Sequence, residues 1–112
     1  AERHIRAFRL YDDCTVSDDR LFCEMQSEDK GGPDGMKVDQ EGNVYSTGPG
    51  GLWIFDPIGR YLGRVVLPEQ PANCAFGGED GRWLFMTART GLYRVRVKTP
   101  GILPGNPNRL SA

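Results

Sequence analysis

Two stretches of the 112-residue chain repeat each other at a spacing of about 40 residues. Pro33–Val38 aligns with Ala72–Gly77 at an offset of 39, and Gly51–Trp53 aligns with Gly91–Tyr93 at an offset of 40. One inserted residue after the intervening turn reconciles the two registers. A period of this length is typical of propellers and solenoids, in which each repeat is one small unit that buries its apolar face against the next.

Each repeat contains short strand-like runs separated by turns. Runs rich in aromatic and β-branched residues alternate with turns rich in Gly, Pro, Asn and Asp, and the chain contains 15 Gly and 8 Pro. Four antiparallel strands in about 40 residues make one propeller blade. The predicted strands are Ile5–Leu10, Leu21–Met25, Met36–Asp39, Val44–Thr47, Leu52–Asp56, Tyr61–Leu67, Cys74–Phe76, Trp83–Thr87 and Leu92–Val97.

The sequence therefore predicts an all-β fold, a partial β-propeller of about two four-stranded antiparallel blades over residues 1–98. Residues 1–26 would supply outer strands of one blade, 33–67 a complete blade and 72–98 three strands of the next, followed by a Pro/Gly-rich tail over 99–112. Propellers close with about four or more blades, so one copy cannot form a ring. Missing N-terminal blades, further copies or exchanged strands would have to cover its open edges. A small antiparallel sandwich with a coincidental repeat is the alternative.

The apolar pattern differs between the two repeats. Leu52–Phe55 is apolar at every position, as expected of a strand in a sheet that is covered on both faces. Tyr93–Val97 instead alternates apolar residues with arginine, as expected of a strand with one face in water. Trp53 and Trp83 lie on predicted strands, and we expect both in the core between blades.

Charge and hydropathy exclude several classes of partner. Fourteen Lys and Arg residues oppose fifteen Asp and Glu residues for a net charge of −1, which supplies no broad cationic field for nucleic acid or an anionic membrane. No apolar run reaches the roughly 18 residues of a transmembrane helix. The polar start of the chain shows no signal-peptide pattern and predicts a cytoplasmic protein, with a removed signal peptide as the alternative.

The reactive side chains outside the repeat have ordinary structural interpretations. The three cysteines cannot all pair within one chain, and we expect reduced thiols, with a Cys14–Cys23 disulfide across a hairpin as the alternative. Cys74 is expected to be a small buried residue, because no histidine partner is in view. His4 is the only histidine, and we expect it at a solvated strand edge.

Asp34 and Asn73 occupy equivalent positions of the two repeats. In a propeller the start of each innermost strand faces the central channel, where ligand and metal sites gather. Two oxygen-bearing side chains there suit a hard cation such as Ca²⁺, which takes about six to eight oxygen ligands. The alternative for Asp34 is a carboxylate that caps its own Pro-Asp-Gly turn.

Several segments together carry a family resemblance that extends from about Glu2 to Gly101. They are Gly32–Asp39, Glu41–Tyr45, Val65–Glu69, Asn73, Ala75–Gly78 and Leu92–Val95. These segments resemble the C-terminal blades of the gluconolactonase family of β-propeller lactonases, which includes regucalcin, also called senescence marker protein.

The resemblance implies a six-bladed propeller with one divalent cation, often Ca²⁺, in its channel, and hydrolysis of sugar lactones or related cyclic esters. In that family the Asp of the Pro-Asp-Gly motif is a metal ligand and a proposed general base, which assigns both roles to Asp34. Asn73 is a channel-lining candidate. The family's other metal ligands precede the segments that match here.

We therefore expect part of a calcium-dependent lactonase that is inactive as an isolated chain. The alternative is a non-catalytic interaction module that oligomerises through its open blade edges. The expected partners are a small sugar lactone or cyclic ester, and either further copies or missing N-terminal blades. Nucleic acid and membrane are not expected as partners.

Overall fold

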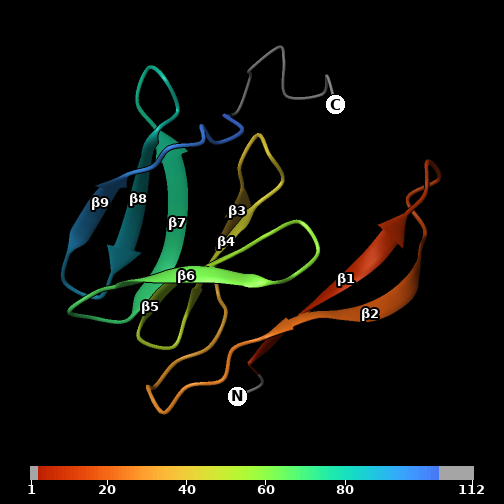
Figure 1. The fold of residues 1–112 in the computed structure, drawn as a ribbon, viewed down its shortest axis with the longest axis horizontal. Coiled ribbons are helices and arrows are strands. Elements are labelled where there is room, and N and C mark those ends of the chain that lie inside the picture. Colours follow the sequence, from red (N-terminus) through yellow and green to blue (C-terminus); the bar gives the residue numbers. More distant parts are fainter. Residues whose placement is uncertain (1–2, 104–112) are drawn as a thin grey trace.

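The computed structural model describes residues 3–103, which form nine strands in three antiparallel sheets (Figure 1). The first sheet is a β1–β2 hairpin, the second has the order β3-β4-β5-β6 and the third the order β7-β8-β9. Within each sheet, strands that are consecutive in the chain are thus adjacent, as in the blades of a propeller. The strands are β1 (His4–Leu10), β2 (Val16–Glu24), β3 (Met36–Val38), β4 (Val44–Gly48), β5 (Gly51–Phe55), β6 (Tyr61–Val66), β7 (Pro71–Gly77), β8 (Trp83–Ala88) and β9 (Leu92–Arg96).

All nine predicted strands are present, and the largest differences from the predicted bounds are at the starts of β2 and β7. β2 begins at Val16 rather than Leu21, and β7 begins at Pro71 rather than Cys74. The added part of β2 is the polar stretch Ser17–Arg20, which nevertheless pairs with β1. Strand pairing uses backbone groups, so a polar stretch can join a sheet without showing an apolar pattern.

Two hairpin turns follow one pattern, in which an aspartate is followed three residues later by a glycine. The Oδ1 atoms of Asp39 and Asp56 each accept hydrogen bonds from backbone N–H groups two and four residues later, at 2.9 and 3.0 Å in the first turn and 3.1 and 2.8 Å in the second. Gly42 and Gly59 adopt φ angles of +87° and +94°, which glycine reaches without strain. These local bonds set the pairing of β3 with β4 and of β5 with β6.

The four-stranded sheet is the middle layer, and both of its faces are covered. One face packs against the hairpin through a core of Ile5, Cys23, Met25, Trp53 and Phe55. The other face packs against the three-stranded sheet through a core of Tyr45, Leu52, Cys74, Leu84 and Met86. Because alternate residues of β5 enter the two cores, the prediction of a strand covered on both faces is confirmed.

Within the part of the chain that the structure describes, the three-stranded sheet is covered on one face only. Tyr93, Val95 and Val97 pack against the second core, whereas Arg94 and Arg96 are exposed, as the alternating pattern predicts.

The predicted core position of Trp53 is confirmed, but that of Trp83 is wrong. Trp83 lies on the uncovered face of the three-stranded sheet and is only half-buried. The guanidinium carbons of Arg94 and Arg96 lie 4.3 and 5.3 Å from the centroid of its ring. Arginine side chains cover this tryptophan, because no other sheet of the described residues packs on its face.

The first part of the tail, residues 99–103, runs back from the third sheet to the second (Figure 1). Residues 99–103 contain no strand, but Gly101 forms an isolated antiparallel bridge with Asp39 at the end of β3. The Gly101 N–H also donates to the Gly81 carbonyl at 2.9 Å. This segment therefore ties the middle sheet to the β7–β8 turn. The predicted tail residues 104–112 lie outside the described residues.

The three cysteines are free thiols, as predicted. Cys14 is exposed, and Cys23 and Cys74 are buried. No helix among residues 3–103 is long and apolar enough to cross a membrane.

Candidate functional site

The start of β3 lies against β7, the inner strand of the next sheet. Gly35 contacts Asn73 so closely that a Cβ added at Gly35 would lie 2.7 Å from the Asn73 Cα and would also collide with its side-chain oxygen. Only glycine fits at such a distance. The structure therefore brings Asp34, the residue before Gly35, next to Asn73 at one end of the inner strands.

Thr47 holds the backbone of this turn. Its hydroxyl oxygen accepts hydrogen bonds from the N–H groups of Asp34, at 3.2 Å, and of Gly35, at 3.0 Å. The Thr47 N–H donates in turn to the Gly35 carbonyl at 2.9 Å. Thr47 is fully buried, so these bonds are shielded from water and fix the Asp34 backbone to β4.

The Asp34 side chain is exposed. Its carboxylate accepts no hydrogen bond and makes no ion pair within residues 3–103, and Thr47 rather than this carboxylate satisfies the turn N–H groups. The alternative that Asp34 caps its own turn is therefore not observed. The backbone of this residue is held rigidly while its carboxylate stays available to a ligand.

Asn73 is also exposed, but its oxygen already has a partner. The Asn73 Oδ1 accepts a hydrogen bond from the Cys74 N–H at 2.8 Å. Its Nδ2 group donates to no other described residue. In this conformation Asn73 therefore presents an amide donor beside Asp34, and one oxygen lone pair remains for a further ligand.

A hollow of about 700 Å³ opens beside Asp34, between the loop that leads into β3 and the end of the three-stranded sheet. Asp34, Glu69, Gln70 and Arg89 line it with polar groups. Two carboxylates, one guanidinium and one amide thus line the same space. A concave site with a few convergent polar groups is typical of small-molecule binding.

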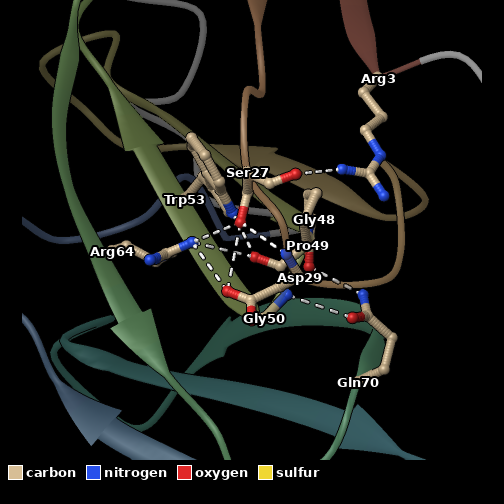
Figure 2. Close-up of polar contacts among 9 residues, drawn as sticks. All are labelled: Arg3, Ser27, Asp29, Gly48, Pro49, Gly50, Trp53, Arg64 and Gln70. Carbon is tan, nitrogen blue, oxygen red and sulfur yellow. Dashed lines mark hydrogen bonds and ion pairs between the residues drawn. The ribbon is translucent and has the colours of Figure 1, made fainter.

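Gln70, which lines the hollow, forms hydrogen bonds with the turn between β4 and β5 (Figure 2). Its Nε2 donates to the Gly48 carbonyl at 2.8 Å and its Oε1 accepts from the Gly50 N–H at 3.3 Å, so it holds the turn between β4 and β5. Gln70 also packs on Gly31, where an added Cβ would collide with its amide group. One side chain therefore sets the spacing between the β4–β5 turn and the loop before Asp34.

Arg64 of β6 holds the same turn from the other side (Figure 2). Its Nη1 donates to the Pro49 carbonyl at 3.3 Å and forms an ion pair with Asp29 Oδ2 at 3.6 Å. Its guanidinium carbon lies 5.0 Å from the centroid of the Trp53 ring, a cation–π geometry. Trp53 Nε1 donates to the same Pro49 carbonyl at 2.9 Å. The β4–β5 turn is thus fixed on both sides.

Glu69 holds the equivalent turn of the three-stranded sheet. Its Oε1 accepts from the N–H and hydroxyl of Thr90, at 3.1 and 2.7 Å, and its Oε2 accepts from the Tyr93 hydroxyl at 2.7 Å. The bond from Tyr93, followed by those from Thr90, lowers the pKa of Glu69 below its ordinary value. Glu69 therefore stays ionised at neutral pH and fixes the turn that follows Arg89.

The described residues do not form a complete metal site. Within residues 3–103 no group of three or more His, Cys, Asp and Glu side chains is placed to hold an ion. Asp34 and Asn73 together offer few of the roughly six to eight oxygens that Ca²⁺ takes. These residues therefore do not fit a whole Ca²⁺ shell by themselves.

The other reactive residues lie away from the hollow. Cys74 is buried in the second core, and this burial raises the pKa of its thiol, which suits a packing role. His4 is half-buried in β1 and does not line the hollow.

The sequence predicts Asp34 and Asn73 as site residues but does not predict four residues around them: Thr47, Glu69, Gln70 and Arg89. Thr47 is the last residue of the predicted strand Val44–Thr47, and no role at the site was predicted for it. Glu69 lies 40 residues after Asp29, and both contact the turn of their own sheet, so the repeat could have indicated it. Gln70 and Arg89 carry no such signal, because their roles depend on how the two sheets pack.

The fold and this site define part of a β-propeller. A solved gluconolactonase from Xanthomonas campestris superposes with a TM-score of 0.71 at 31% sequence identity, covering 88% of this chain and 30% of that one. A family model described as the SMP-30/Gluconolactonase/LRE-like region matches residues 1–90, and the chain belongs to this family. The predicted fold class and the resemblance to gluconolactonases are thereby confirmed.

Curated relatives match the chain over part of their length. It is 48% identical over 71 residues to a gluconolactonase of Zymomonas mobilis, covering 62% of this chain and 20% of that protein. It is 40% identical over 86 residues to the pentonolactonase XacC of Haloferax volcanii, covering 72% and 29% respectively. The chain therefore spans less than a third of the length of these relatives.

Proposed function

We propose that this chain forms part of a hydrolase that opens sugar lactones or related cyclic esters, with Asp34 as its general base. The observation that carries the proposal is the Asp34 carboxylate itself, which is exposed beside a hollow on a backbone that Thr47 holds rigid. Membership of the gluconolactonase family supports the reaction type.

In the proposed reaction Asp34 takes a proton from water as the water oxygen bonds to the lactone carbonyl carbon. The bond between that carbon and the ring oxygen then breaks. The ring oxygen receives the proton that Asp34 took from water and becomes a hydroxyl, which restores the Asp34 carboxylate, and the product is an open-chain sugar acid. The rigid turn around Gly35 supports this role, because a base must be held within hydrogen-bond distance of its water.

We further propose that Asp34 supplies one ligand to a divalent cation, Ca²⁺ foremost, with Asn73 lining the channel beside it. Such an ion supplies polarisation of a carbonyl oxygen when bound. Because the described residues supply few of its ligands, the remaining ligands must come from groups outside residues 3–103. We therefore expect little or no hydrolysis by the isolated chain.

The test compares the wild type with Asp34→Asn in the protein as its natural host produces it. We expect the variant to lose most glucono-lactone hydrolysis and to bind Ca²⁺ more weakly by calorimetry, with an unchanged urea midpoint. Asp12→Asn is the matched control, because Asp12 is an exposed aspartate in the β1–β2 turn. Equal hydrolysis and equal Ca²⁺ isotherms for wild type and Asp34→Asn would contradict the proposal.

A second candidate is a non-catalytic module that oligomerises through its uncovered surfaces. It is favoured by the large apolar side chains that remain exposed, among them Leu92 on the three-stranded sheet and Phe8, Leu10 and Val16 on the hairpin. Exposed apolar groups of this size on sheet faces and edges are typical of interaction surfaces.

Light scattering separates the two candidates. The interaction module predicts a mass above that of the monomer at micromolar concentration and no lactone hydrolysis in any preparation. A monomer under these conditions would exclude it and leave the hydrolase.

A further inference from the structure

We infer that Arg89 binds the carboxylate of the open-chain sugar acid in the hollow beside Asp34. This inference deepens the proposed function and rests on it. A lactone is neutral, whereas its hydrolysis product is an anion at neutral pH. A cationic side chain in the same hollow as the base therefore distinguishes the product from the substrate.

The first observation is the position of Arg89. It follows directly after β8 and lines the same hollow as Asp34. Its side chain is exposed, and its guanidinium donates no hydrogen bond to another described residue. All five N–H donors of this planar group are therefore available to a ligand in the hollow, and they match the two oxygens of a carboxylate.

The second observation is that the nearby carboxylate of Glu69 already accepts hydrogen bonds from other residues. Glu69 lies near enough to Arg89 for the arginine charge to help lower the Glu69 pKa. Both Glu69 oxygens nevertheless accept hydrogen bonds from Thr90 and Tyr93 rather than from Arg89. These bonds anchor the turn next to Arg89, so the backbone that carries the guanidinium is fixed without consuming its donors.

The third observation is the charge of Asp34. The carboxylates of Asp34 and Glu69 both line the hollow and repel the carboxylate that forms there, so a product anion would find this hollow unfavourable without a cation. Arg89 is the only Lys or Arg among the described residues that line it. Asp34 and Arg89 thus have different roles, because Asp34 takes a proton from water while Arg89 binds the carboxylate of the product.

The experiment is a calorimetric titration with sodium gluconate, with neutral sorbitol as the uncharged probe. We expect Arg89→Gln to weaken gluconate binding about fivefold, the effect of one exposed ion pair, and Arg89→Lys to restore part of it. Sorbitol binding should change less than gluconate binding. Lys98→Gln is the control, because it removes one exposed positive charge from the other end of the sheet.

Equal gluconate affinities for wild type and Arg89→Gln would overturn the inference, as would parallel losses for gluconate and sorbitol or no gluconate binding by the wild type. Gluconate binding can be measured without turnover. The experiments can therefore refute the Arg89 site and the hydrolase independently of each other. Gluconate binding through Arg89 without lactone hydrolysis would refute the hydrolase and keep the Arg89 site. Hydrolysis that gluconate inhibits equally in wild type and Arg89→Gln would refute only the Arg89 site.

Discussion

The four-stranded and three-stranded sheets carry the same repeat, yet equivalent residues have different surroundings. Leu52 of β5 is fully buried, whereas Leu92 at the equivalent position of β9 is 68% exposed. Thr47 is buried and holds the Asp34 turn, while its counterpart Thr87 is exposed. Among residues 3–103 the four-stranded sheet is covered on both faces and the three-stranded sheet on one. A repeat therefore encodes the shape of a sheet, and its neighbours decide which residues become core.

The equivalent turns of the two sheets are also held by different means. The β4–β5 turn is fixed by Arg64, Gln70 and Asp29, which come from two other parts of the chain. The β8–β9 turn relies on Glu69 and on the Tyr93 hydroxyl. The second turn therefore depends on one carboxylate, which makes it the more sensitive of the two to pH.

The largest expected effect tests the difference in burial. Leu52→Ala should lower the free energy of unfolding by about 2–5 kcal/mol, because it opens a cavity in a packed core. Leu92→Ala should change it by no more than about 0.5 kcal/mol, as for most surface substitutions. Urea denaturation of both variants provides the measurement. A comparable loss in Leu92→Ala would mean that another sheet or a second copy covers this face in solution.

The next effect concerns the contact between the two sheets. Gly35→Ala should cost about 1–3 kcal/mol, because the new methyl group would collide with the backbone and side chain of Asn73. Gly63→Ala on β6 is the control, since nothing lies within 4 Å of its added Cβ. Thermal unfolding of both variants measures the difference. A Gly35→Ala variant as stable as Gly63→Ala would show that β3 and β7 are not in close contact.

A smaller effect on stability should distinguish Thr47 from its counterpart Thr87. Thr47→Val should cost about 1–2 kcal/mol, because the N–H groups of Asp34 and Gly35 lose their acceptor in a partly buried turn. Thr87→Val should stay within about 0.5 kcal/mol, since Thr87 is exposed. Urea midpoints give the stabilities, and Ca²⁺ titration shows whether Asp34 is displaced. Equal losses in the two variants would contradict the role assigned to the Thr47 hydroxyl.

The smallest effect is a pH dependence that distinguishes the two turns. The folded protein lowers the Glu69 pKa below the ordinary value of 4.5. The stability from this group is therefore fully present above about pH 4.5 and lost as the pH falls through the lowered folded pKa. Between about pH 6 and pH 3, the urea midpoint of the wild type should fall further than that of Glu69→Gln. Parallel curves would exclude a stabilising role for the ionised carboxylate.

Much of the fold could be predicted because its determinants are local. Glycine and proline turns separate the strands, and Asp39 with Gly42 makes a turn whose hydrogen bonds lie within five residues. Trp83 was misplaced because its apolar ring indicates burial, while its actual cover is arginine side chains from the neighbouring strand β9. The order of the strands follows from local sequence signals, whereas the residues that cover a face of a sheet depend on how distant segments pack.

Only part of the candidate site could be predicted. Asp34 and Asn73 stand out because the repeat aligns them and a Pro-Asp-Gly motif marks one of them. Gln70 and Arg89 have no motif, and they acquire a role only when β7 and β8 lie beside the loop before β3. A hollow formed by three segments distant in sequence carries no linear signal.

The sequence by itself determined the strands, the turns and the position of the Asp34 carboxylate within its repeat, because backbone hydrogen bonds and glycine conformations depend on near neighbours. The tertiary structure decided which equivalent residues are buried, which side chain anchors the Asp34 turn and which cationic side chain lines the same hollow as Asp34. Burial and electrostatic proximity are properties of packed surfaces, so they arise only once separate sheets come together.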